Sequence, residues 1–98
     1  MTAPATSVLD GAWELSPRVS VRPESFGALL YHFGTRRLSF LKDRRLLDVV
    51  QRLPQSASAR EACTAAGLTA AELPAYGTAL AQLAATDMIR PRDLEERA

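Results

Sequence analysis

The sequence predicts an α+β fold resembling a winged helix-turn-helix domain, with a three-stranded antiparallel sheet followed by three helices. Residues 19–42 alternate apolar and polar side chains with the period of two that is typical of strands. Residues 43–87 repeat apolar side chains at helical spacing instead, and no Lys or Arg occurs between Arg60 and Arg90. The chain has 98 residues, 47% of them hydrophobic, which is enough for one domain with a small core.

The first two strands are predicted around a turn that follows Pro23. Val19 and Val21 alternate with polar side chains over residues 18–22, and Pro23 is expected to end this strand. The second strand carries Leu29, Tyr31 and Phe33 on one side and apolar side chains on the other as well. Because both of its sides are apolar, we expect this strand to be central.

The third strand is predicted over residues 37–42, after a turn at residues 34–36. It places Leu38 and Phe40 on one face and Leu41 on the other. We expect it to form an edge of the sheet.

The first two helices have clear start and stop signals. Asp43 is a suitable N-cap for a helix that runs through residue 53. Ser58 and Glu61 form a capping box that opens a short second helix, and Gly67 closes it.

The third helix repeats the capping signal with Thr69 and Glu72. Pro74 lacks an amide hydrogen, so we expect it in the first turn of this helix. The helical pattern ends near Asp87.

The domain is predicted over residues 10–92, with flexible tails at 1–9 and 93–98. Cys63 is the single cysteine, so the chain cannot form an internal disulfide. The start of the sequence lacks the features of a secretion signal, and no apolar run has the roughly 20 residues that a bilayer requires. We therefore expect a cytoplasmic protein that does not insert in a membrane.

The charge distribution is uneven along the chain. The formal net charge is +1, but residues 1–60 hold nine Lys or Arg against five acids, and residues 61–98 hold three against six. A net charge this small gives no strong long-range attraction for nucleic acid. An anionic partner is expected to meet the strand half.

The residues for catalysis or metal binding are sparse. His32 and Cys63 are the single His and Cys, and a structural metal site needs three or four ligands. We interpret His32 as a partly exposed strand residue and Cys63 as a small core residue. The glycines do not have the spacing of a phosphate-binding loop, so we expect no catalytic residue, metal or bound cofactor.

Capture of a peptide fits the pattern better than binding to DNA. Between Thr69 and Asp87 only Gln82 has a side chain suited to reading bases, which disfavours a major-groove reader. The edge strand at residues 37–42 could instead accept a peptide as an added strand, with the last helix as the opposite wall of a groove. The alternative is that Leu80 and Leu83 lie wholly in the core and the edge strand is covered.

A long contiguous run of residues resembles a known family. Residues 22–41, RPESFGALLYHFGTRRLSFL, are similar to the mycofactocin peptide chaperones, which are small relatives of pyrroloquinoline-quinone biosynthesis protein D. The likeness extends over residues 9–92 and implies a RiPP recognition element. Such a domain binds the leader of the mycofactocin precursor peptide and presents the precursor to a radical S-adenosylmethionine (radical SAM) maturase. The iron–sulfur cluster and S-adenosylmethionine would belong to that enzyme.

The resemblance also implies which residues bind the peptide. It implies that the leader pairs antiparallel with the third strand and lies in the cleft toward the third helix. The corresponding residues here are Arg37, Leu38, Ser39, Phe40, Leu41 and Lys42 in the strand, with Tyr76, Leu80 and Leu83 in the helix.

Three readings remain open at this point: a peptide chaperone, a winged-helix DNA-binding regulator, and a stand-alone cofactor-dependent enzyme. A strand edge that captures a peptide can also pair with a second copy of the chain, so a homodimer is a further possibility.

Overall fold

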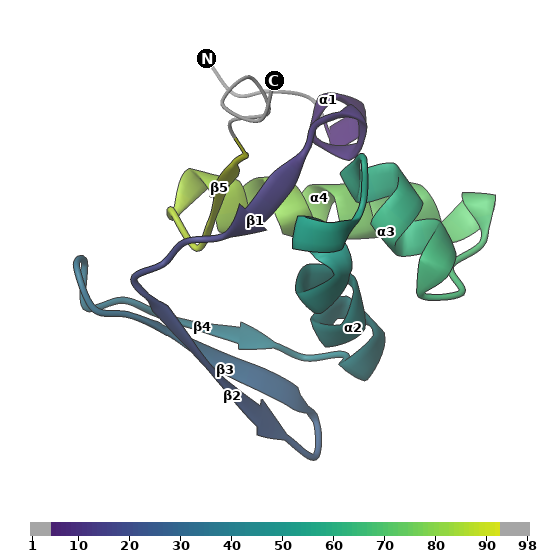
Figure 1. Ribbon diagram of the computed structural model, residues 1–98. Helices are drawn as coiled ribbons and strands as arrows, with labels where there is room; N and C mark the ends of the chain where they lie inside the picture. Colours follow the sequence, from purple (N-terminus) through teal and green to yellow (C-terminus); the bar gives the residue numbers. More distant parts are fainter. Residues whose placement is uncertain (1–4, 93–98) are drawn as a thin grey trace.

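The computed structural model describes residues 5–92 and shows an α+β fold with helices packed on one side of a three-stranded sheet (Figure 1). It confirms the predicted α+β class and the antiparallel sheet. In chain order the elements are α1 (Ala5–Asp10), β1 (Trp13–Leu15), β2 (Val19–Glu24), β3 (Gly27–His32), β4 (Leu38–Leu41), α2 (Arg44–Arg52), the 3-10 helix η1 (Leu53–Gln55), α3 (Ala59–Ala65), the 3-10 helix η2 (Ala70–Glu72), α4 (Leu73–Ala85) and β5 (Ile89–Pro91).

The larger sheet has the strand order β2-β3-β4, so β3 is central as predicted and β2 and β4 are its edges. The His32 amide donates to the Arg37 carbonyl at 2.9 Å, and the Phe33 amide donates to the Arg18 carbonyl at 2.8 Å. In an antiparallel ladder, hydrogen-bonded pairs occur at every second residue. These two bonds therefore fix which main-chain groups of each edge strand point away from the sheet.

Pro23 lies inside β2, so the prediction that it ends the strand is wrong. The register places Pro23 opposite Ala28, next to the pair formed by Arg22 and Leu29. By the alternation of the ladder, the Pro23 nitrogen points away from β3. Its missing hydrogen therefore costs the sheet no bond, as is usual for proline in an edge strand.

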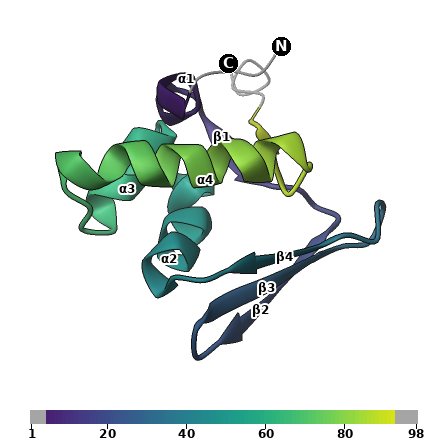
Figure 2. The ribbon, with the colours of Figure 1, turned by 180° about the vertical axis from the view of Figure 1, so that it is seen from behind.

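The two faces of this sheet differ in what covers them. On the inner face, Ala28, Leu30 and Leu41 are at most 1% exposed. Both views show the helices on this side of the sheet alone (Figures 1 and 2). We call the opposite side the outer face, and it carries the side chains of Phe26, Leu29, Tyr31, Phe33, Leu38 and Phe40.

The predicted caps of α2 and α3 are confirmed. The Asp43 carboxylate accepts a hydrogen bond from the Arg45 amide at 2.8 Å, and α2 follows directly. The Ser58 hydroxyl accepts one from the Glu61 amide at 3.2 Å at the start of α3. Gly67 follows α3 with a φ of 91°, a left-handed conformation that glycine adopts without strain.

The capping box predicted for Thr69 and Glu72 is confirmed with both of its bonds, although it opens the short helix η2 rather than α4 itself. The Thr69 amide donates to the Glu72 carboxylate at 2.9 Å. α4 then begins at residue 73, with Pro74 in its first turn as predicted. It ends at residue 85, close to the predicted end at Asp87.

The amino-terminal segment differs from the flexible tail predicted over residues 1–9. Residues 5–10 form α1, and the Val8 and Leu9 side chains are 3% and 1% exposed. Trp13 Nε1 donates to the Val8 carbonyl at 2.8 Å, which ties α1 to β1. The tails predicted at residues 1–4 and 93–98 lie outside the described residues.

A second sheet, which the sequence pattern did not reveal, joins the two ends of the described chain. β1 pairs antiparallel with β5, and Leu15 lies opposite Ile89. Met88 and Ile89 are 0% and 1% exposed, so the apolar pair that follows α4 belongs to the core.

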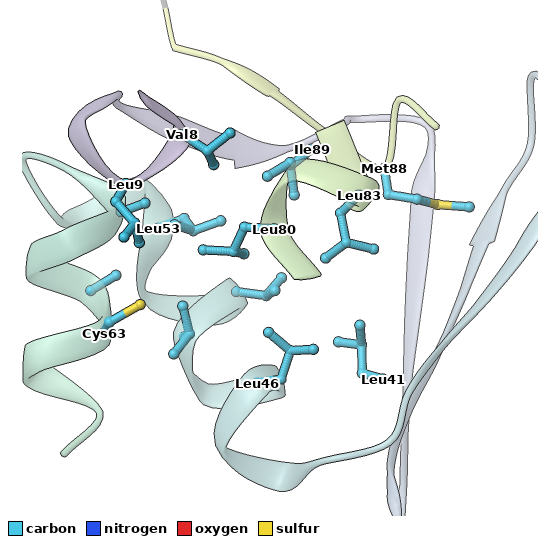
Figure 3. Close-up of a cluster of buried hydrophobic side chains, with 14 of the residues drawn as sticks. Val8, Leu9, Leu41, Leu46, Leu53, Cys63, Leu80, Leu83, Met88 and Ile89 are labelled. Carbon is cyan, nitrogen blue, oxygen red and sulfur yellow. The ribbon is translucent and has the colours of Figure 1, made fainter. Parts of the chain in front are cut away.

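The core lies between the inner face, α1 and the three later helices (Figure 3). Figure 3 shows Leu9, Leu53 and Leu80 from three different helical segments within one cluster. Cys63 is fully buried among them, which confirms it as a small core residue. Burial raises the pKa of its thiol, so this cysteine is a poor nucleophile.

Candidate functional site

The outward edge of β4 is unpaired within residues 5–92. The bond from His32 to Arg37 places Ser39 and Leu41 in the hydrogen-bonded pairs with β3. The main-chain N–H and C=O groups of Leu38 and Phe40 therefore point away from the sheet. Unpaired groups of this kind are a template for another strand.

An apolar cleft of about 420 Å³ lies along this edge, between β4 and α4. Its floor and walls include Leu41, Leu46 and Leu83, and Figure 3 shows that all three side chains are part of the core cluster. Ala79 and Ala85 of α4 also line it, and their small side chains leave the space open. The remaining lining residues are Ser39, Phe40, Gln82 and Thr86.

Contacts outside the cleft lining join α4 to the start of α2. The Tyr76 hydroxyl donates a hydrogen bond to the Asp43 carboxylate. The Arg45 guanidinium lies 5.9 Å from the centre of the Tyr76 ring and binds the Glu72 carboxylate with two bonds of 2.6 and 3.2 Å. Asp43 follows β4 by two residues, so these contacts hold the end of β4 against α4.

The same contacts change the acidity of the groups involved. The hydrogen bond from Arg45 lowers the pKa of Glu72 below its ordinary value, and the bond from the Thr69 amide adds to this effect. Burial raises the pKa of Tyr76, and its hydrogen bond to Asp43 raises it further. Glu72 is therefore ionised and Tyr76 protonated at neutral pH, the states that these bonds require.

A second contact, between His32 and Asp87, joins the β3–β4 turn to the residues after α4. His32 Nδ1 accepts hydrogen bonds from the amides of Gly34 and Thr35 at 2.9 and 3.0 Å, so this nitrogen carries no proton. His32 Nε2 then donates its hydrogen to the Asp87 carboxylate at 2.8 Å. These bonds tie the β3–β4 turn to the end of α4.

His32 is 2% exposed, so its interpretation as a partly exposed residue is wrong. It lies on the inner face, where the helices cover it, and both of its ring nitrogens have partners. Across the described part of the chain, no three His, Cys, Asp or Glu side chains gather as metal ligands. His32 thus acts as a structural contact of the turn.

The structure brings together part of the predicted peptide-binding set. Ser39, Phe40, Leu41 and Leu83 line the cleft. Arg37 and Lys42 are exposed at the two ends of β4. Leu38 is exposed on the outer face.

Two predicted residues have other positions. Leu80 is fully buried in the core, so it has no surface to offer a peptide. Tyr76 is half-buried and binds Asp43, and it is not among the residues that line the cleft. The difference between Leu80 and Leu83 depends on the rotation of α4 about its axis, which helical spacing alone left open.

Sequence reasoning missed five residues that line the cleft: Leu46, Ala79, Gln82, Ala85 and Thr86. Ala79, Leu83 and Thr86 follow the spacing i, i+4, i+7 and so share one side of α4. This spacing could have predicted which side of α4 lines the cleft. The prediction instead included Leu80, which lies on the buried side of α4.

The exposed charges beside β4 are basic. Arg36, Arg37 and Lys42 are all exposed, and none of them forms an ion pair with another described residue. They are therefore available to carboxylates of a bound partner. No helix among residues 5–92 has the length and apolar character needed to cross a membrane.

Comparisons with known proteins agree with the resemblance found in the sequence. The Peptide chaperone MftB family model matches residues 12–90. Peptide chaperone MftB of Mycobacterium tuberculosis is 53% identical over 83 residues, which cover 85% of this chain and 76% of that protein. The Mycobacterium ulcerans protein of the same name is 49% identical over 87 residues, covering 89% and 80%.

A third protein of that name, from Mycolicibacterium smegmatis, is 48% identical over 86 residues, covering 88% of this chain and 84% of the relative. No solved structure gives a significant match. A family match over most of the chain, with three relatives near half identity, establishes that this chain belongs to the peptide chaperone MftB family.

Proposed function

We propose that this protein is a peptide chaperone that binds the leader of the mycofactocin precursor peptide and delivers the precursor to a radical SAM maturase. The observation that carries this proposal is the unpaired edge of β4 beside an apolar cleft. Membership of the peptide chaperone MftB family supports the peptide as the partner.

The leader adds to β4 as an antiparallel strand. Its main chain bonds to the outward N–H and C=O groups of Leu38 and Phe40, about 4.8 Å from the β4 backbone. Every second leader side chain then points toward α4 and enters the cleft beside Leu41 and Leu83. Backbone pairing supplies affinity with little sequence preference, and the cleft selects leaders with apolar side chains at alternate positions.

Charged groups set the register of the leader. Arg37 and Lys42 lie at opposite ends of β4, where carboxylates of the leader can reach them. Because both side chains are exposed, they contribute mainly to the rate of encounter and to orientation rather than to affinity.

The expected affinity is moderate. Each apolar leader side chain buried in the cleft contributes about 1.5–3 kcal/mol, while ordering the leader backbone costs about 1–2 kcal/mol per residue. Because these terms largely cancel, we expect a Kd of about 1 μM, on the order of 8 kcal/mol, rather than very tight binding. Binding of this strength suits a carrier that must release its peptide to an enzyme.

The chemistry of maturation belongs to the maturase in this proposal, and this chain binds without turnover. We also propose that the domain is a variant of the winged helix-turn-helix fold that has lost DNA binding. α4 contains no Lys or Arg, so it lacks the cations with which a recognition helix meets phosphates.

The test compares Phe40→Pro with Phe40→Ala in titrations with a labelled leader peptide. Both variants lose the ring, but only the proline removes the outward amide hydrogen, and Pro23 shows that this sheet accepts proline at an outward-pointing position. We expect Phe40→Pro to bind at least tenfold more weakly than Phe40→Ala, with both variants folded. Equal affinities would remove β4 pairing from the proposal.

A duplex of random DNA is titrated in parallel with the peptide. The proposal predicts no binding at physiological salt. Binding to DNA alone, with a steep salt dependence, would favour a DNA-binding regulator instead.

A further inference from the structure

The outer face is an exposed apolar surface that the proposed peptide site meets only at β4, through Leu38 and Phe40. In the described part of the chain, the large hydrophobic side chains with high exposure are Phe26, Phe33, Leu38 and Phe40, at 46%, 60%, 55% and 57%. All four belong to this one face. Contiguous exposed apolar surface of this kind marks an interaction site more often than chance.

The aromatic rings of the outer face pack against one another in pairs. The Tyr31 and Phe33 rings pack edge to face with their centres 5.3 Å apart. The Phe26 and Phe40 rings lie 6.4 Å apart at an angle of 51°. Rings fixed in this way lose little conformational freedom when a partner covers them, which favours binding.

A leader strand on β4 cannot cover this surface. Neighbouring strands are about 4.8 Å apart, so an added strand lies roughly 10 Å from the backbone of β3. Tyr31 and Phe33 project from β3 and from the residue that follows it. They remain exposed when the peptide is bound, and a different partner is needed to bury them.

The charges around the outer face indicate the character of that partner. Arg22 projects from β2 on this side, Arg36 lies in the β3–β4 turn, and Lys42 lines a shallow pocket with Phe26 and Phe40. Glu24 is the nearby acid, and it is bound to Arg22 at 2.9 Å.

The net positive charge of this rim argues against self-association. Pairing the outer faces of two copies would bring cations against cations. An apolar surface with an acidic rim on another protein is the complementary partner.

We propose that the outer face docks a folded protein with an apolar, acid-rimmed surface, and that this protein is the maturase. The identity of the partner rests on the proposed function, whereas the surface and its charge rest on the residues above. Peptide and maturase then bind on different sides of β4 at the same time. The chaperone holds the leader while the enzyme acts on the remainder of the precursor.

The test measures the affinity of the complete chain for the purified mycofactocin radical SAM maturase and, separately, for the leader peptide. Phe33→Glu places a carboxylate on the outer face beside Tyr31, at a residue that does not line the cleft. We expect at least a tenfold loss of maturase affinity and leader affinity within twofold of the unmodified protein. Ala75→Glu adds the same charge at an exposed position of α4 and should change neither affinity.

A second variant guards against loss of folding. Arg22→Glu reverses a rim charge at an exposed side chain, so it should weaken maturase binding severalfold and reduce its dependence on salt. Circular dichroism spectra and melting temperatures identify any variant that has unfolded.

The outcomes separate this inference from the proposed function. If the unmodified protein binds both partners and Phe33→Glu still binds the maturase normally, the outer face is not the docking surface and the proposed function stands. If the unmodified protein binds no maturase, both the proposed delivery of the precursor and the proposed docking surface fail. If it forms a dimer that Phe33→Glu dissociates, the occupant is a second copy and the inference is overturned.

Discussion

The inner and outer faces of the β2-β3-β4 sheet carry similar apolar side chains but differ in burial. Leu30 on the inner face is 0% exposed, whereas Leu38 on the adjacent strand is 55% exposed. The sheet is tied to the α4 region by two contacts, His32–Asp87 after β3 and Asp43–Tyr76 after β4. No described segment covers the outer face. The comparison indicates that packing against the helices buries the inner face, whereas the outer face stays open to a partner.

The largest expected effect is a difference in stability between two Leu→Ala variants. Leu30→Ala leaves a cavity in the core and should lower the free energy of unfolding by about 2–5 kcal/mol. Leu38→Ala removes an exposed side chain and should change it by about 0.5 kcal/mol or less. Urea denaturation of the two variants measures both values, and similar losses would mean that the outer face is covered in solution.

A smaller effect is expected where the inner face meets the end of α4. Asp87 has a φ of 62°, a left-handed conformation that suits Asp and Asn but strains Ala, and its carboxylate accepts the His32 hydrogen bond. Asp87→Ala should therefore lower the free energy of unfolding by about 1–3 kcal/mol. Asp87→Asn keeps both features and is the control, expected to lie within about 0.5 kcal/mol of the unmodified protein.

This pair of variants also tests whether the contact between Asp87 and His32 joins β3 to the end of α4. If Asp87→Ala were as stable as Asp87→Asn by thermal melting, the contact with His32 would not hold β3 to α4.

The smallest expected effect is a pH dependence of the contact between Glu72 and Arg45. Glu72 has a lowered pKa in the folded protein, so its ion pair with Arg45 stabilises the fold above the ordinary Glu pKa of 4.5. The stabilisation is lost as the pH falls through the lower, folded pKa. Glu72→Gln keeps the capping box and removes the charge. The stability difference between it and the unmodified protein should be present at pH 7 and vanish in acid.

Urea denaturation at a series of pH values checks this prediction. A difference in stability that stays constant from pH 7 down to strongly acidic pH would show that the charge of Glu72 has no part in the contact.

Local signals in the sequence predicted the elements that they determine. Alternation identified the three strands of the larger sheet, and the caps at Asp43, Ser58 and Thr69 located the starts of the helical segments. These signals act over a few residues and do not require knowledge of the fold. Membership of the family followed from a contiguous run of residues in the same way.

The features that sequence reasoning missed depend on contacts between distant residues. Val8 and Leu9 are buried because α1 packs against α4, more than sixty residues later in the chain. Pro23 is tolerated because of the register between β2 and β3. The cleft likewise depends on where Ala79 and Ala85 lie after α4 has docked. None of these follows from the local pattern.

Hydrogen exchange at the β4 amides tests the central claim most directly. In the free protein, the amides of Leu38 and Phe40 should exchange quickly and those of Ser39 and Leu41 slowly, because only the latter bond to β3. Saturating leader peptide should slow the exchange of Leu38 and Phe40 at least tenfold. Protection of these two amides before the peptide is added, or unchanged exchange while the peptide is bound, would contradict the account.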